Sequence, residues 1–94
     1  MKIALDFDET YTEDEDLWKQ FIDISRENGH EVYIVARRAD DGDNIDIECS
    51  FAVMFQKVPV IYCGFKPKRE VCERHGLLID VWIDDWPMAI DGAV

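Results

Sequence analysis

The sequence predicts an α/β fold in which one parallel sheet of four strands is covered by helices on both faces. Four short apolar runs alternate with three longer stretches whose apolar residues recur near the helical period. The four runs are residues 2–7, 32–35, 58–63 and 77–83. Runs of this length are typical of buried strands, and strands that alternate with helices form parallel sheets.

The composition is that of a single globular domain. All 94 residues fit one domain, 1–94, and an apolar fraction of 48% is sufficient for a packed core. The formal net charge of −11 makes broad nucleic-acid binding and binding to acidic membranes unfavourable. The first apolar run begins at Ile3 without a charged leader, and no segment approaches the roughly 18 apolar residues that a membrane span needs. We therefore expect a soluble, cytoplasmic protein, and the sequence leaves its oligomeric state open.

The first strand and the first helix follow one another almost directly. Residues 2–7 form a near-continuous apolar run that is too short for a helix. Thr12 and Glu15 have the spacing of a capping box, and Asn28-Gly29 is a typical helix end. This pattern predicts a helix that begins near Thr12 and ends before Gly29.

A polar loop separates the second strand from the second helix. Residues 32–35 are β-branched and aromatic, and they lead into Ala36-Arg37-Arg38. After the loop at 40–44, the pattern predicts a helix over 45–55. The expected apolar stripe of this helix consists of Ile45, Cys49, Ala52 and Val53.

The last two strands flank the third helix. Pro59 stands near the start of the strand at 58–63 and fits an edge position, because proline has no N–H to donate. Pro67 suits the first turn of the following helix, and Gly76 suits its end. The fourth strand is expected over 77–83.

Two acidic clusters constrain the strand order. Asp6-Phe7-Asp8 closes the first run, and Asp84-Asp85 closes the last. If the first and fourth strands are neighbours, both clusters meet at one sheet edge, and right-handed crossovers then favour the order 3-2-1-4. This arrangement resembles a Rossmann-like three-layer sandwich whose switch point, the usual place for a ligand, lies between these two strands.

The same clusters predict a metal site. Asp6 and Asp8 are two positions apart, so in an extended strand both side chains point to the same face. Four carboxylates at one edge repel one another and need a cation. Mg²⁺ prefers one or two carboxylates together with waters and phosphate oxygens. We therefore expect Mg²⁺ near Asp6, Asp8, Asp84 and Asp85.

Half of the ten basic residues follow the second and third apolar runs. They are Arg37, Arg38, Lys66, Lys68 and Arg69. A local patch of this kind can hold a small phosphorylated substrate even though the chain as a whole is acidic.

These motifs resemble, in their order, those of the haloacid dehalogenase-like (HAD) hydrolases. Asp6-Phe7-Asp8-Glu9-Thr10 is similar to the DxDxT signature of that family, and a lysine and an acidic pair follow in the family's order. The resemblance covers most of the chain. It implies a Mg²⁺-dependent phosphohydrolase, that is, a phosphatase.

The resemblance also implies roles for single residues. Asp6 is the nucleophile that forms an aspartyl-phosphate, and Asp8 is the general acid and then the general base. Lys68, or alternatively Lys66, neutralises the charge of the nucleophile and the phosphoryl group.

The implied metal ligands come from both acidic clusters. Asp84 binds Mg²⁺ together with Asp6 and the backbone carbonyl of Asp8, and Asp85 lies in or next to the coordination sphere. Phosphoryl transfer depends on such positioning and charge neutralisation.

Two positions depart from the family pattern. The family has Ser or Thr at the end of the second strand, where the hydroxyl binds a phosphoryl oxygen, and this chain has Ala36. Arg37 or Arg38 can replace that contact with a charge-assisted hydrogen bond. Glu9 stands where many members have Gly. A second function therefore stays open, that of a catalytically impaired domain that binds a metal and a nucleotide or protein partner.

The size of the chain bears on the substrate. Members of the family often carry a cap domain, but only residues 9–13 separate the first strand from its helix, so we expect no cap domain and an open site. Such a site suits a phosphorylated small molecule or nucleotide, or the terminal phosphate of a polynucleotide. Trp86 either packs the C-terminal tail onto the sheet or offers a stacking platform for a nucleobase.

A receiver-like phosphoacceptor domain is a third alternative. Its acceptor aspartate would follow a middle strand, whereas the second and third strands of this chain end at Ala36 and Cys63. Cys49, Cys63 and Cys72 lack CxxC spacing and lie in or beside apolar stretches, so we expect reduced thiols that pack as small apolar side chains.

Overall fold

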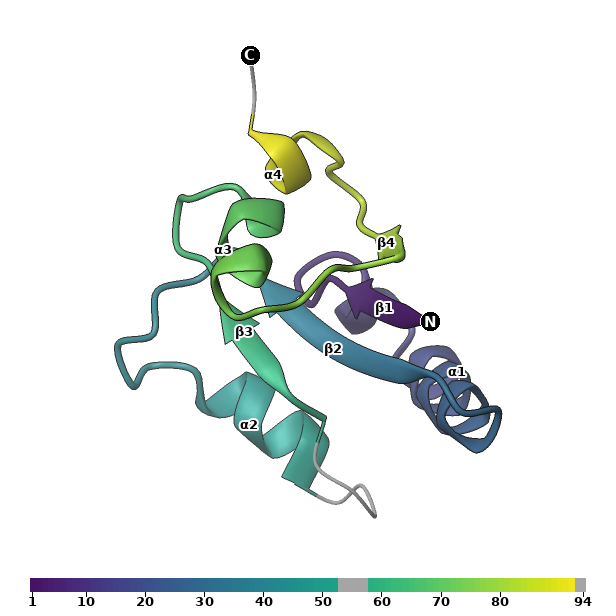
Figure 1. Ribbon diagram of the computed structural model, residues 1–94. Coiled ribbons are helices and arrows are strands. Elements are labelled where there is room, and N and C mark those ends of the chain that lie inside the picture. Colours follow the sequence, from purple (N-terminus) through teal and green to yellow (C-terminus); the bar gives the residue numbers. More distant parts are fainter. Residues whose placement is uncertain (53–57, 93–94) are drawn as a thin grey trace.

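A sheet of four parallel strands in the order β3-β2-β1-β4 forms the centre of the computed structural model, which describes residues 1–52 and 58–92 (Figure 1). The strands are β1 Lys2–Leu5, β2 Glu31–Ala36, β3 Val60–Tyr62 and β4 Val81–Ile83. The predicted fold class and strand order are confirmed. β1, β3 and β4 are each shorter than expected, because strand pairing covers only four residues of β1 and three residues each of β3 and β4.

Helices cover both faces of this sheet (Figure 1). The helical elements are η1 Tyr11–Glu13, α1 Glu15–Glu27, α2 Ile45–Ala52, α3 Lys68–Arg74 and α4 Met88–Asp91. The short helix α4 was not expected, since four residues are too few to show a helical period. Among the described residues, no helix combines the length and the apolar character needed to cross a lipid bilayer.

Adjacent residues of the central strands point to opposite faces and so enter two separate cores. Leu5 and Ile34 pack on the face covered by α1 and α2, together with Ile22 of α1. Ala4 and Val35 pack on the other face, which α3 covers. This alternation is the period of two of an extended strand, and burial on both faces explains the continuous apolar runs of the sequence.

Helix α1 begins later than the capping-box pattern predicts. Its N-cap is Asp14, whose side chain accepts a 3.1 Å hydrogen bond from Leu17 N. Thr12 lies in the preceding η1, where its hydroxyl oxygen accepts a 3.0 Å bond from Glu9 N. The capping-box prediction was therefore wrong, because a 3₁₀ turn takes up the residues directly after the first motif.

The buried face of α2 also differs from the expected one. Ile45 is 69% exposed and Cys49 is exposed, whereas Ile47 and Phe51 are buried. Both pairs have the i, i+4 spacing that places two side chains on one helix face. The helix face that carries Phe51 packs against the sheet, because Phe51 contacts two other aromatic rings of the core. Val53, the last residue of the expected stripe, lies outside the described residues.

Three smaller expectations concern single residues. β3 is an edge strand, as predicted, but Pro59 directly precedes it instead of lying within it, and the Pro59 carbonyl accepts a 2.8 Å bond from Ile34 N. Pro67 is the N-cap of α3, one position before the predicted first turn, and Gly76 follows the C-cap with a φ of 75°. A positive φ of this kind is typical of the glycine that ends a helix.

The cysteines are free thiols, as predicted, but only two belong to the core. Cys63 and Cys72 are buried, whereas Cys49 is exposed on α2. The expectation of a buried Cys49 was wrong for the same reason as the expected stripe of α2.

Candidate active site

The pairing of β1 with β4 brings the two acidic clusters together. Leu5 pairs with Ile83, and the next residue, Asp6, donates a 2.9 Å backbone hydrogen bond to the Ile83 carbonyl. The residues that follow both strands therefore lie at the same carboxyl edge of the sheet. Carboxylate oxygens of Asp6, Asp84 and Asp85 come within 4.8 Å of one another there.

Lys68, the first residue of α3, provides a cation inside this cluster. Its Nζ donates a 2.7 Å bond to Asp6 Oδ1 and a 2.6 Å bond to Asp84 Oδ2. The lysine is only 1% exposed, so its charge and those of its partners compensate one another away from bulk water. Lys66, the alternative from the sequence, is exposed and lies outside the cluster.

The electrostatic environment of Asp6 favours its protonated form. The pKa of Asp6 is raised to about 6: burial raises it most, a hydrogen bond with Asp85 also raises it, and Lys68 lowers it. The same hydrogen bond with Asp6 lowers the pKa of Asp85. Above the pKa of Asp6, the three carboxylates carry more negative charge than one lysine neutralises, and such an excess of negative charge favours cation binding.

Thr10 connects the first motif to the last. Its Oγ1 lies 3.2 Å from Asp6 Oδ2 and 3.1 Å from Asp85 Oδ1, and it accepts a 3.2 Å bond from Asp85 N. Sequence reasoning gave this buried threonine no role of its own, although it is the threonine of the DxDxT motif.

Glu9, directly before Thr10, has a φ of 63°, a backbone conformation that residues with a Cβ rarely adopt. This explains why a glycine would also suit position 9.

The carboxylate of Asp8 is held apart from the other three. Arg38 donates to both of its oxygens, from Nε at 2.9 Å and from Nη2 at 2.6 Å. Arg38 also binds Asp46 of α2, with bonds of 2.7 and 2.9 Å. The hydrogen bonds with Asp8 contribute most to raising the pKa of Arg38, and those with Asp46 come next. The metal-binding role implied for the backbone carbonyl of Asp8 stays a prediction.

The three residues expected to bind phosphate have separate positions. Ala36 ends β2 and is buried, so it offers no polar side chain. Arg38 is engaged by carboxylates, as described above. Arg37 is exposed at the sheet edge, where its guanidinium carbon lies 4.6 Å from the centre of the Trp86 ring.

These residues surround one cavity of about 350 Å³ at the carboxyl edge of the sheet. Its lining consists of Asp6, Asp8, Glu9, Arg37, Lys68, Asp84, Asp85, Trp86 and Ala89. The structure therefore brings most of the predicted site residues together, and it leaves Ala36, Arg38 and Lys66 outside the lining.

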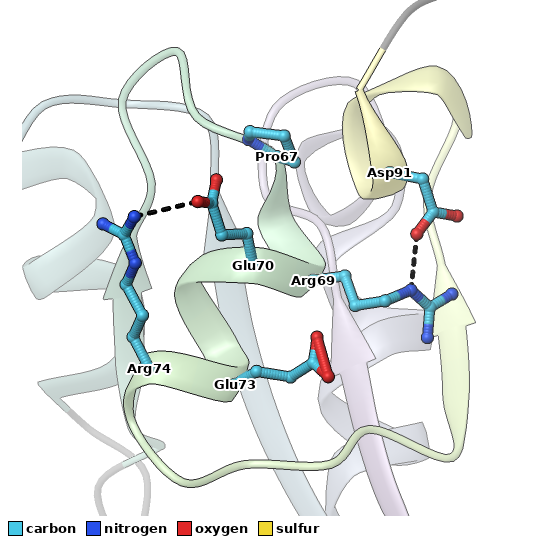
Figure 2. Close-up of a pocket in the computed structure, with 6 residues that line it drawn as sticks. All are labelled: Pro67, Arg69, Glu70, Glu73, Arg74 and Asp91. Carbon is cyan, nitrogen blue, oxygen red and sulfur yellow. Dashed lines mark hydrogen bonds and ion pairs between the residues drawn. The ribbon is translucent and has the colours of Figure 1, made fainter.

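A second hollow lies on the outer side of α3 and is also rich in charge (Figure 2). Its arginines are paired locally, Arg69 with Asp91 at 2.5 Å and Arg74 with Glu70 at 2.8 Å. These pairs are exposed and contribute little energy. The hollow has no buried titratable group, so we place the candidate site at the sheet edge.

Comparisons of this chain with protein-family models, with curated proteins and with solved structures found no match. The functional interpretation therefore rests on the residues at the carboxyl edge of the sheet.

Proposed function

We propose that the chain is a Mg²⁺-dependent phosphohydrolase that cleaves a phosphate monoester through an aspartyl-phosphate on Asp6. One observation carries this proposal: the buried Asp6 lies beside Lys68 and within 4.8 Å of two further carboxylates. A carboxylate nucleophile needs neighbouring cations that lower its repulsion from an anionic phosphoryl group. The resemblance to the HAD hydrolases points to the same reaction.

The donor set fits a hard cation. Asp6, Asp84 and Asp85 offer only oxygen ligands, and Mg²⁺ takes such ligands together with water and phosphate oxygens. These three residues would hold the ion, which would neutralise charge on the phosphoryl group.

The reaction has two steps, each with a defined path for its atoms. In the first, an Asp6 oxygen bonds to phosphorus while the ester oxygen leaves with a proton from Asp8. In the second, water attacks phosphorus, Asp8 takes a proton from that water, and the bond to Asp6 breaks to release phosphate. Lys68 compensates the charge of Asp6 throughout, and Asp8 has to leave Arg38 before it can reach the ester oxygen.

A catalytically impaired domain that binds a metal and a nucleotide or protein partner is the second candidate. Two observations favour it. Ala36 provides no hydroxyl, and the loss of one transition-state donor costs roughly 2.7–4 kcal/mol by analogy with an oxyanion hole. Both oxygens of Asp8 are held by Arg38.

Release of phosphate from an aryl phosphate separates the two candidates. The wild-type protein should release phosphate with Mg²⁺ and not with EDTA, and Asp6→Asn should abolish the release. Asp23→Asn, an exposed carboxylate on α1, is the matched control and should keep full activity. Equal background release by wild type and Asp6→Asn would rule out the phosphatase, and Mg²⁺ binding without turnover would then support the impaired domain.

The free thiols of all three cysteines support the cytoplasmic location expected from the sequence, because disulfides are rare in a reducing compartment.

A further inference from the structure

We propose that Arg37, Phe65 and Trp86 form a recognition platform for a planar aromatic ring, so that the ester at this site is a nucleoside monophosphate. The reaction itself rests on the proposed function, and the platform adds the class of molecule. We refer to these three residues as the aromatic platform.

The aromatic platform is assembled from three separate segments at the carboxyl edge of the sheet. Arg37 follows β2, Phe65 follows β3, and Trp86 follows β4. The guanidinium carbon of Arg37 lies 4.6 Å from the centre of the Trp86 ring and 5.3 Å from that of Phe65. At these distances a guanidinium group is attracted to the ring faces.

The two rings are exposed to a degree that core packing does not explain. Phe65 is 91% exposed and Trp86 is 42% exposed. The loop before Phe65 is nevertheless fixed by backbone hydrogen bonds, from Gly64 N to the Arg38 carbonyl at 2.9 Å and from Lys66 N to the Cys63 carbonyl at 3.1 Å. A bound planar ring would remove these apolar faces from water.

Arg37 is the cation of the site whose charge is still available. Lys68 is held by Asp6 and Asp84, and Arg38 is held by Asp8 and Asp46. Arg37, by contrast, contacts aromatic rings only, among the residues that the structure describes. Its charge can therefore pair with a phosphate oxygen while its plane remains next to the rings.

The aromatic platform is continuous with the active-site cavity. Arg37, Trp86 and Ala89 line that cavity and also a neighbouring hollow, whose other walls include Phe65 and Lys66. A phosphate next to Asp6 and a base next to Trp86 thus fit one ligand.

The charge distribution limits the size of this ligand. Among the described residues that line the cavity and the neighbouring hollow, only Arg37 and Lys66 offer exposed positive charge, and the chain as a whole carries −11. A longer oligonucleotide would extend onto an acidic surface, where its phosphates are repelled. A single nucleotide uses both cations without that repulsion.

Paired substrates test the aromatic platform in the intact chain. The kcat/KM values for adenosine 5′-monophosphate and for ribose 5-phosphate are measured with Mg²⁺, and their ratio reports the contribution of the base. Trp86→Leu and Phe65→Leu should each lower this ratio about ten-fold, since one stacked base is worth roughly one decade of affinity.

The variant Trp86→Leu keeps the backbone N–H at position 86, which donates a hydrogen bond to Asp84 Oδ1, so the carboxylate keeps this bond. Leu78→Ala is the matched control, because Leu78 is an exposed apolar residue before β4 at the opposite sheet edge, and it should leave the ratio unchanged.

Binding measured without turnover keeps this inference separate from the proposed function. Calorimetric titration of Asp6→Asn with adenosine 5′-monophosphate should give at least ten-fold tighter binding than with ribose 5-phosphate. If no ester is hydrolysed but this preference exists and disappears in Phe65→Leu, the aromatic platform is supported and the phosphatase fails. If both esters are hydrolysed and neither aromatic variant changes their ratio, the aromatic platform is overturned and the phosphatase stands. Preference for a 5′-phosphorylated single-stranded oligonucleotide over the mononucleotide would also overturn the inference.

Discussion

Lys68 Nζ donates a 2.7 Å hydrogen bond to Asp6 Oδ1 across 62 positions of the sequence. The same nitrogen reaches Asp84, so one buried amine links the first strand, the third helix and the segment after the last strand. This buried lysine therefore contributes to both the charge balance and the geometry at the carboxyl edge of the sheet.

Replacing Lys68 by methionine should destabilise the protein by about 3 kcal/mol, because two buried carboxylates lose their cation. Urea unfolding in EDTA measures this change in the free energy of unfolding. Lys66→Met is the matched control, two positions away and exposed, and it should stay within about 0.5 kcal/mol of wild type. A loss of less than 1 kcal/mol in Lys68→Met would contradict the buried ion pair.

The stability of the metal-free protein should fall as the pH rises from 4 to 6. Asp6 has a pKa of about 6 in the folded state against 3.8 as its ordinary value, so in this window the folded state holds a proton that the unfolded chain has lost. The stabilisation is complete below pH 4 and is lost as the pH rises through 6, and about two pK units correspond to roughly 3 kcal/mol. Asp6→Asn lacks this titration. In EDTA, its unfolding free energy relative to wild type should therefore rise by that amount between pH 4 and pH 7, and a constant difference would refute the raised pKa.

If Mg²⁺ binds the folded state alone, as proposed, it should stabilise the wild-type protein by about 2.7 kcal/mol at one hundred times its dissociation constant. Asp84→Asn and Asp85→Asn should each reduce this response, which thermal unfolding with Mg²⁺ and with EDTA measures. Asp80→Asn is the control, because that carboxylate accepts a bond from Lys2 N at the other end of β4. It should lower stability without changing the response to Mg²⁺, and an equal loss of response in all three variants would argue against a site at these carboxylates.

Brief treatment of the folded protein with iodoacetamide should modify Cys49 alone. Cys49 is exposed, whereas burial raises the pKa of Cys63 to about 12 and also raises that of Cys72. The thiolate is the reactive form, so both buried thiols should react only after unfolding. Peptide mass spectrometry should find one adduct in the native protein and three in urea, and early modification of Cys63 would contradict the packing beside α3.

The strand order and the carboxylate cluster could be predicted from the sequence, because the positions of the acidic residues limit which strands can be neighbours. Asp6 lies near the end of the first short apolar run and Asp84 directly follows the last one, and the expectation that the two acidic clusters meet placed β1 beside β4. Lys68 was identified by its place before the last strand, and it does reach Asp6.

The hydrogen-bond partners of Asp8 could not be predicted in the same way. Its bond to Arg38, and through Arg38 to Asp46, depends on how α2 lies against the end of β2. The sequence pattern gave the wrong face for α2, because both faces carry apolar pairs of helical spacing and only packing against the aromatic core decides between them. The position of Arg37 against Phe65 likewise depends on a loop conformation that no periodicity encodes.

The hydrogen bond from Asp85 N to Thr10 Oγ1 spans 75 positions, and this separation has a consequence for synthesis on the ribosome. The first acidic motif emerges before β4, and β1, once paired with β2, has one unpaired edge until β4 has been translated. A nascent chain thus carries Asp6 at an open sheet edge until β4 follows. Docking of the last strand both assembles the carboxylate cluster and covers an edge on which two incomplete chains can pair with one another.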